Sequence, residues 1–349
     1  MRTYLAKSYM MKKSVLLFLL GLHLSSATFK ICAFNIRSFG EAKASNKKIM
    51  DVLVKILTRC DISVIQEVRD SKGEAVPTLV AELNRYDTSH RYKYLESKRL
   101  GKNSYKEQFV FIYRSDSVKV VDWYQYVEDH PDHPEAFARE PFVVRFHSPR
   151  TVIKDFALMS HHTCPREAAK EINRLLQVML EVKSYWRTES IMLLGDLNAA
   201  CGYVTNEEWK KIQLQSSNTF YWLIGDKDDT TVNTKTHCAY DRIVVHGEEF
   251  LKGIIPGSAK PFNFQKKLEL SEEEVGVAIA GLYKKCSYLK QGFLQGALLC
   301  MQLFYALFTR SEDPSQLRIE HKKKDFWRTT NRSALAQPQT RFQADAACN

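Results

Sequence analysis

The sequence has no run of apolar residues that reaches the roughly 20 needed to span a membrane as a helix. Its eight cysteines include no Cys-x-x-Cys pair, which argues against a zinc site, and no internal repeat is present. With 349 residues, 44% hydrophobic and 26% charged, the chain can build a sizeable core, and the composition excludes a disordered or fibrous protein. We therefore expect a soluble globular fold without a membrane span.

The net charge of +11 lies mostly at the two ends of the chain. Residues 1–27 have four basic and no acidic side chains, and residues 275–349 have 11 basic and five acidic ones, so the body, residues 28–274, has a net charge of only +1. Net charge in the body is therefore no argument for nucleic-acid binding. Such an argument has to come from particular arginines near a site.

The N-terminus has the pattern of a cleaved signal peptide. A Lys-Lys pair precedes an apolar run at residues 15–24, and Ser25-Ser26-Ala27 follows with small residues where a signal peptidase cleaves. The alternative is a buried first helix, but core helices seldom combine a basic flank with such an ending. We predict a signal peptide over residues 1–27. The protein is then secreted or in the lumen of the endoplasmic reticulum, where disulfides form.

The body alternates short apolar runs with helical periodicity. It begins with a strand at residues 30–36, a helix capped by Ser45 or Asn46, and a strand at residues 62–68. Later elements are strands at 109–113, 142–146, 155–160, 191–194 and 241–245, and a long amphipathic helix at about 167–186. The pattern predicts an α/β fold with mixed strands.

No linker interrupts the body, so we predict one domain over residues 28–274. Residues 275–349 sustain neither helical nor strand periodicity, and we expect a divergent, largely irregular tail there. Cys32 and Cys60 stand at the beginnings of two expected parallel strands and can therefore pair.

Polar side chains stand where the expected strands end or begin, the places at which layered α/β folds collect their active sites. Carboxylate and amide oxygens among them suit magnesium or calcium, whereas no cluster of Cys or His suits a transition metal. Nearby arginines can clamp phosphate oxygens. The residues are Asn35, Arg37, Glu67, Arg69, Arg139, His161, His162, Asp196, Asn198 and Asp241. Each alone is commonly a turn or surface residue, but together they indicate phosphoryl transfer.

Ordered segments of the body are recognisable as a set. They are Phe34-Asn35-Ile36-Arg37-Ser38-Phe39-Gly40-Glu41, Gln66-Glu67-Val68-Arg69-Asp70-Ser71, Asn103-Ser104-Tyr105-Lys106-Glu107, Arg139-Glu140-Pro141, Gly195-Asp196-Leu197-Asn198-Ala199 and Cys238-Ala239-Tyr240-Asp241-Arg242-Ile243-Val244. Over about residues 29–274 the chain closely resembles the secreted deoxyribonuclease I family, deoxyribonuclease-I-like members included. The resemblance implies a four-layered sandwich, two packed mixed β-sheets flanked by helices. It also implies cleavage of double-stranded DNA with Mg²⁺ as catalytic and Ca²⁺ as structural cofactor.

The resemblance also implies roles for single positions. The catalytic positions of the family correspond here to Asn35, Glu67, Glu107, His162, Asp196, Asn198 and Asp241. Among these, Glu67, Asp196 and Asn198 handle the metal, and Glu107 orients His162. DNA-contacting positions correspond to Arg37, Arg69, Tyr105 and Arg139, and structural calcium positions fall near Asp229, Thr231, Glu135 and Glu140. The structural disulfide of the family corresponds to Cys201 and Cys238.

The chain departs from the family at its end. The family finishes with a Ser-Asp-His motif on a final core strand, which supplies a metal-site aspartate and a second catalytic histidine, and no Ser-Asp-His occurs here. We therefore expect a metal-dependent endodeoxyribonuclease of little sequence specificity whose activity is impaired in this form. As partners we expect double-stranded DNA but not actin, and we expect a monomer.

Two alternatives stay open at this stage. One is a catalytically dead form of the same fold that binds DNA or protein. The other keeps the fold and changes the substrate, as in abasic-site endonucleases, sphingomyelinases or inositol phosphatases. The signal peptide and the pair Cys201 and Cys238 argue against an abasic-site endonuclease and against an inositol phosphatase.

Overall fold

The computed structural model describes residues 28–102, 104–128, 136–232, 235–271 and 286–291, the last segment by its backbone alone. The expected signal peptide, Glu135 and most of the expected tail lie outside the described residues. Among the helices of the described residues, none is long and apolar enough to cross a membrane.

Within the described residues, two six-stranded sheets form the inner layers of the fold. The first has the order β11-β12-β1-β2-β4-β3, with β1 (Phe29–Phe39), β2 (Ile62–Val68), β3 (Tyr92–Glu96), β4 (Gln108–Arg114), β11 (Lys260–Phe262) and β12 (Cys286–Gln291). The second has the order β5-β6-β7-β8-β10-β9, with β5 (Lys119–Gln125), β6 (Phe142–His147), β7 (Asp155–Ser160), β8 (Ile191–Asp196), β9 (Phe220–Trp222) and β10 (Asp241–His246).

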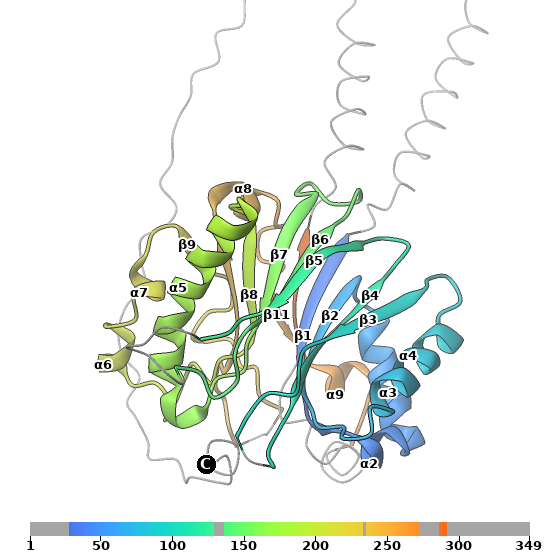
Figure 1. Ribbon diagram of the computed structural model, residues 1–349. Coiled ribbons are helices and arrows are strands. Elements are labelled where there is room, and N and C mark those ends of the chain that lie inside the picture. The colour runs from blue at the N-terminus through green and yellow to red at the C-terminus, as the bar shows by residue number, and fades with distance from the viewer. Residues whose placement is uncertain (1–27, 103, 129–135, 233–234, 272–285, 292–349) are drawn as a thin grey trace, which may run out of the picture. The chain divides into compact units, whose positions relative to one another are not determined.

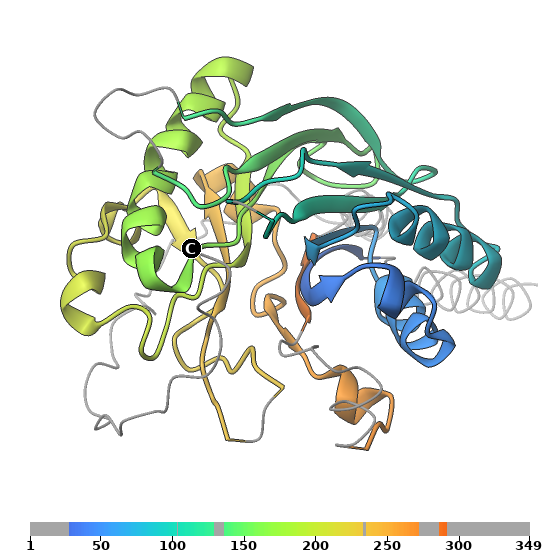
Figure 2. The same ribbon diagram turned by 60° about the horizontal axis from the view of Figure 1, so that its bottom comes forward.

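Helices cover the outer face of each sheet. Figure 1 and Figure 2 show α3 (Lys47–Leu57) and α4 (Ala75–Tyr86) beside the first sheet, and α5 (Ala168–Trp186) beside the second. The shorter helices are α2 (Glu41–Ala44), α6 (Asn206–Trp209), α7 (Gln213–Ser216), α8 (Glu248–Lys252), α9 (Phe264–Lys267) and a 3₁₀ turn at Pro165–Glu167. The predicted four-layered sandwich of two mixed sheets flanked by helices is confirmed.

The alternation of side chains along β1 explains the layers. Ile31 and Ala33 point into the core between the two sheets, whereas Cys32 and Phe34 point into the core beneath α3 and α4. A strand with both faces buried has apolar residues in succession rather than in alternation, as β1 does over residues 31–34. A third core lies between α5 and the second sheet.

The tail contributes a strand that the sequence pattern does not predict. β12 runs antiparallel to β1, from Phe29 opposite Gln291 to Ala33 opposite Ser287, and antiparallel to β11 on its other side. Sheet pairing uses backbone groups, so a segment without clear alternation can still pair with a strand whose edge would otherwise stay open. The expectation of an irregular tail is wrong for residues 286–291.

Two disulfides join described cysteines. Cys32 is bonded to Cys60, and Cys201 to Cys238, and both pairs agree with the expectations from the sequence. Cys164 is disulfide-bonded as well. The second bond closes a loop of 36 intervening residues, since the two positions are 37 apart.

Loss of the second disulfide is expected to lower the free energy of unfolding by about 3–4 kcal/mol, because cross-linking a loop of this length restricts the unfolded chain. The variant is Cys201→Ser with Cys238→Ala, and urea unfolding of the oxidised protein is the measurement. An unfolding midpoint equal to that of the wild type would contradict the expectation.

Candidate active site

The site lies at one edge of both sheets because of the strand directions. β1 and β2 are parallel, as are β7 and β8, so the carboxyl ends of each pair lie together, and the antiparallel strands β4, β6 and β10 begin at the same edges. Side chains at these ends and beginnings come from Asn35, Glu67, Glu107, Arg139, His162, Asp196 and Asp241.

One amide joins the two carboxylates at the centre of the site. Asn35 Nδ2 donates to Glu67 Oε1 at 2.8 Å, within the first sheet, and to Asp196 Oδ2 at 3.0 Å, across to the second. Asn35 Oδ1 accepts from the backbone N–H of Arg37 at 2.8 Å, which fixes the orientation of the amide. Asn35 on β1 therefore joins the ends of β2 and β8.

His162 is held at one ring nitrogen and directs the other at these carboxylates. Its Nδ1 lies 2.8 Å from Glu107 Oε1, and its Nε2 lies 3.7 Å from Asp196 Oδ2 and 4.0 Å from Glu67 Oε1. An ionised carboxylate only accepts, so Nδ1–H donates to Glu107, and Nε2 is the nitrogen that can exchange a proton within the site.

The electrostatics of the pair agree with this assignment. Burial alone raises the pKa of Glu107, but the Arg139 guanidinium and the His162 imidazole hold it below its usual value. Burial and Arg139 lower the pKa of His162, whereas Glu107 and Asp196 raise it, and the net pKa lies above the usual value. Glu107 therefore stabilises the protonated imidazole.

Arg139 lies inside the site. Its side chain is 0% exposed, with Nε 3.0 Å from Glu107 Oε1 and donating to the His162 carbonyl at 3.0 Å. Its two terminal nitrogens are buried without a hydrogen-bond partner among the described residues. A DNA contact by Arg139 stays a prediction, and it requires the phosphate to reach the floor of the site.

The backbone of the site is strained at four positions. Arg37, Ser38, Glu67 and Asn198 have φ between 45° and 57°, the left-handed region that side chains other than glycine seldom adopt. Such residues persist only where the surroundings hold them, and they cluster at active sites. Asn198 is held by its own side chain, whose Nδ2 donates to the Thr163 carbonyl at 3.0 Å.

Lys43 on α2 supports the turn at Arg37. Its Nζ donates to the Ile36 carbonyl at 2.8 Å and also to the Arg37 carbonyl. Burial lowers the pKa of Lys43 to about 8, opposed by the attraction of Glu67 and assisted by the repulsion of Arg37. Nothing in the sequence pattern points to this lysine.

Two of the residues expected to contact DNA, Arg69 and Tyr105, contact each other beside the first sheet. The Arg69 guanidinium lies over the ring of Tyr105, 3.9 Å from its centroid, and Arg69 Nη1 donates to Ser38 Oγ at 3.3 Å. Arg37, Arg69 and Tyr105 are partly exposed. Cation–π stacking leaves the edge of the guanidinium able to bind an anion.

The expected metal ligands divide into two groups. Among the described residues, no three His, Cys, Asp or Glu side chains are grouped as a metal cage. Magnesium does not need one, since proteins usually hold it with one or two carboxylates, waters and substrate phosphates. Glu67 and Asp196, joined by Asn35, fit that mode. Mg²⁺ binding by these residues stays a prediction.

Two of the expected calcium residues, Asp229 and Thr231, lie before β10, whereas Glu140 precedes β6. Asp229 Oδ1 accepts from Thr231 Oγ1 at 2.6 Å and from the Thr231 backbone N–H at 2.9 Å, and Asp229 Oδ2 lies 3.4 Å from His237 Nδ1. Asp241, at the start of β10, is buried opposite Asp196. Calcium binding by Asp229, Thr231 and Glu140 stays a prediction.

Comparison with known proteins decides the family. Residues 32–261, more than half of the chain, match the Endonuclease/Exonuclease/phosphatase family. The chain belongs to this family.

Within the family the chain is a deoxyribonuclease-I-like member. Deoxyribonuclease-1 of Mus musculus is 49% identical over 259 residues, which cover 74% of this chain and 90% of that protein. Deoxyribonuclease gamma of Homo sapiens is 46% identical over 263 residues, which cover 74% of this chain and 85% of that protein. The resemblance seen in the sequence motifs is confirmed.

Solved structures of the Endonuclease/Exonuclease/phosphatase family share the fold. The human Nocturnin catalytic domain matches with a TM-score of 0.52 at 12% identity, covering 77% of this chain and 95% of that one. The humanized D. rerio TDP2 matches with a TM-score of 0.50 at 16% identity, covering 76% and 99%. These likenesses concern the fold alone.

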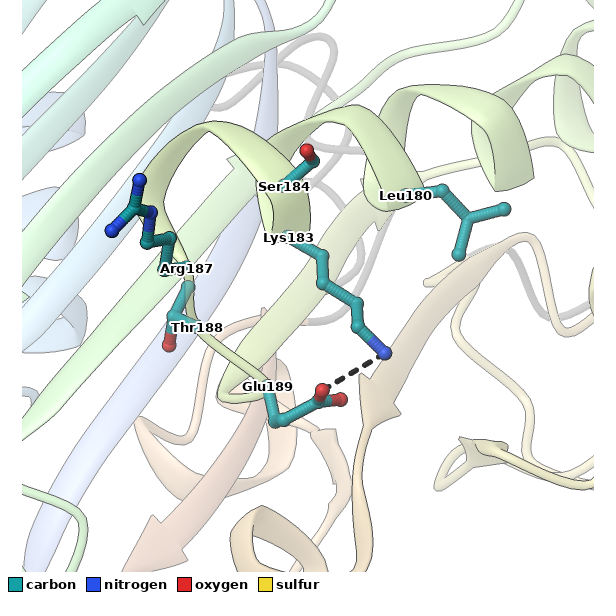
Figure 3. A pocket seen from close by; sticks show the side chains of 6 residues that line it. All are labelled: Leu180, Lys183, Ser184, Arg187, Thr188 and Glu189. Atoms are coloured by element: carbon teal, nitrogen blue, oxygen red, sulfur yellow. Dashed lines mark ion pairs between the residues drawn. The ribbon is translucent and has the colours of Figure 1, made fainter.

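A surface hollow elsewhere on the protein lacks the paired histidine and carboxylates of the site. The hollow lies at the end of α5, has a volume of about 580 Å³ and is lined by Leu180, Lys183, Ser184, Arg187, Thr188 and Glu189. Figure 3 shows these side chains. Glu189 precedes β8, whereas Asp196 ends it, so the hollow and the site lie at opposite ends of this strand. The ion pair between Lys183 and Glu189 spans 2.9 Å.

Proposed function

We propose that this protein is a metal-dependent endonuclease that hydrolyses phosphodiester bonds of double-stranded DNA with little sequence specificity. The observation that carries the proposal is the pair of His162 and Glu107, with Nε2 of the histidine directed at two carboxylates that one amide joins. The named activity of the deoxyribonuclease relatives supports DNA as the substrate.

The reaction is an in-line displacement at phosphorus. Water attacks opposite the leaving oxygen, His162 Nε2 accepts the proton of that water, and the bond from phosphorus to the leaving oxygen breaks. Glu107 stabilises the imidazolium that forms. The leaving oxygen is protonated, and the proton on His162 Nε2 returns to solvent, which restores the neutral imidazole.

Glu67 and Asp196, with Asn35 and Asn198 beside them, are the residues that would hold Mg²⁺. When bound, the ion supplies neutralisation of the charge that develops on the phosphate. A structural Ca²⁺ at Asp229 and Thr231 belongs to the same proposal.

Arg37, Arg69 and Tyr105 supply the DNA contact. Arginine and tyrosine at a minor groove respond to groove width and backbone position more than to base identity, which gives weak sequence preference. We also propose that the protein is secreted, because its two disulfides form in oxidising compartments such as the secretory pathway.

The binding-only alternative is not favoured, because His162, Glu107 and both carboxylates are assembled as a hydrolase requires. The test is conversion of supercoiled plasmid to the nicked form by the purified mature chain in Mg²⁺ and Ca²⁺. No conversion above a control with chelator would contradict the proposal.

Activity is expected to be reduced by the divergent end of the chain. A chimera in which everything after Glu274 is replaced by a family ending with Ser-Asp-His should nick plasmid about 10²–10⁴-fold faster, the usual contribution of one general acid or base. Steady-state nicking rates of the two proteins at equal concentration are compared. Equal rates would show that the missing histidine makes no difference, and the expected impairment would be abandoned.

A further inference from the structure

Gln66 connects the two sheets at the site, although it has no role in the reaction described above. It lies on β2 beside Glu67 and is fully buried. Its Oε1 accepts from the backbone N–H of Asp196 at 2.9 Å, and its Nε2 donates to the His161 carbonyl at 2.6 Å. One side chain of the first sheet therefore binds two strand ends of the second.

The Gln66 side-chain amide replaces one backbone hydrogen bond of the ladder between β7 and β8. The parallel register of these strands ends at Ser160 opposite Leu194, and the His161 N–H still donates to the Leu194 carbonyl at 3.4 Å. In a regular parallel ladder the Asp196 N–H would then donate to the His161 carbonyl. Here both groups bind Gln66 instead, so the side-chain amide is inserted between the two strands.

Gly195 leaves the space that the amide occupies. Its φ is +141°, and a Cβ at this position would lie 2.3 Å from Gln66 Nε2 and 2.3 Å from the His161 carbonyl oxygen. Both the conformation and the close approach need glycine. The fit between Gln66 and Gly195 is thus a second observation that the inserted amide is built into the site.

The inserted amide binds backbone groups that adjoin two of the reacting residues. The His161 carbonyl belongs to the peptide that leads into His162, and Asp196 is bound through its own N–H. Gln66 is also the neighbour of Glu67 on β2. We propose that Gln66 is a positioning residue, which sets the spacing between His162 and Asp196 and ties both to Glu67. This inference rests on the proposed function.

The variant that tests it is Gln66→Met, which keeps the length of the side chain and removes both hydrogen bonds. We expect kcat for plasmid nicking to fall about 10- to 100-fold with KM for DNA nearly unchanged, as is usual when a partner that orients ligands is lost. The Mg²⁺ concentration for half-maximal rate should rise. Gln66→Asn, whose side chain is too short to reach both partners, should likewise lower kcat and leave KM nearly unchanged.

Ile65→Ala is the matched control. Ile65 is the preceding residue of β2, equally buried, but its side chain packs in the core beneath α3 and α4. It should lower Tm and leave kcat of the folded protein unchanged. If Gln66→Met lowers kcat no more than Ile65→Ala does at equal loss of Tm, Gln66 is structural only and the inference is overturned.

Gly195→Ala disturbs the same contact by changing the partner of Gln66 instead of Gln66 itself. The added Cβ displaces the amide without removing a polar group, so kcat should again fall with KM unchanged. The double variant Gly195→Ala with Gln66→Met should lose about as much as the worse single variant, because both disturb one contact. Losses that multiply would overturn the inference.

Failure of the inference is distinguishable from failure of the proposed function. Wild-type nicking with an unchanged kcat in Gln66→Met contradicts the positioning role alone. If the wild type does not nick DNA, the proposed function fails, and a crystal structure of Gln66→Met decides the positioning role. Retention of the 3.7 Å distance between His162 Nε2 and Asp196 Oδ2 would then overturn it.

Discussion

Replacement of His162 by glutamine is expected to slow DNA hydrolysis by about 10²–10⁴-fold, the range for loss of one general acid or base. Glutamine keeps a polar group near Glu107 but cannot carry a proton between water and phosphate. DNA affinity should stay nearly unchanged, because the partly exposed arginines and Tyr105 are untouched. Nicking rates and fluorescence anisotropy of labelled duplex in chelator measure the two quantities.

His147 provides the matched control for this prediction. Its Nδ1 lies 3.2 Å from Asp155, so it also forms a histidine–carboxylate pair, but at the end of β6 remote from the site and partly exposed. His147→Gln should leave the nicking rate unchanged. Equal rates for His162→Gln and wild type would remove His162 from the mechanism.

Replacement of Glu67 by glutamine is expected to abolish most metal-dependent cleavage, by more than the roughly 100-fold that loss of an outer-shell partner costs. The amide is nearly isosteric, so Ser38 and Asn35 keep a neighbour of the same size, while the negative charge that we propose binds Mg²⁺ is lost. Nicking rate as a function of Mg²⁺ concentration is the measurement. A normal rate at the usual Mg²⁺ concentration would refute the metal assignment.

Two further variants, Arg69→Ala and Glu82→Gln, separate the effect on Mg²⁺ dependence from the effect on DNA binding. Arg69→Ala should weaken DNA binding and reduce its salt slope by about one while leaving the Mg²⁺ dependence in place. Glu82, on α4 and paired with Arg85, is a carboxylate outside the site, and its replacement should change neither quantity. The metal effect and the binding effect are therefore separable.

The strands and helices with strong periodicity can be predicted from the sequence. Asn46 caps α3 through a bond from the Ile49 N–H, and α5 covers nearly the range expected for the long amphipathic helix. Edge strands are harder to predict. β5 is exposed or half-buried along its length, so its sequence does not alternate between buried apolar and exposed polar residues. The first turn of α4 contains Pro77, which obscures its helical pattern.

The site can be predicted to the extent that chemistry depends on residue type at strand ends. Carboxylates, a histidine and arginines in those places indicate phosphoryl transfer from the sequence alone. The burial of Arg139, the support by Lys43 and the insertion of Gln66 cannot be predicted, because each depends on contacts between side chains and segments that meet only in the folded chain. β12 gives no signal in the sequence because backbone pairing with β1 needs no side-chain pattern.

The measurement that tests the central claim most directly is cleavage of supercoiled plasmid by the purified mature chain, followed with time in Mg²⁺ and Ca²⁺. RNA, sphingomyelin vesicles and an inositol phosphate at equal phosphate concentration serve as competing substrate classes, and His162→Gln serves as the control for a contaminating nuclease. We predict that plasmid is nicked, that chelator and His162→Gln both suppress nicking, and that the other substrates are hydrolysed far more slowly. Nicking of equal rate by wild type and His162→Gln, or faster hydrolysis of another substrate, would contradict the account.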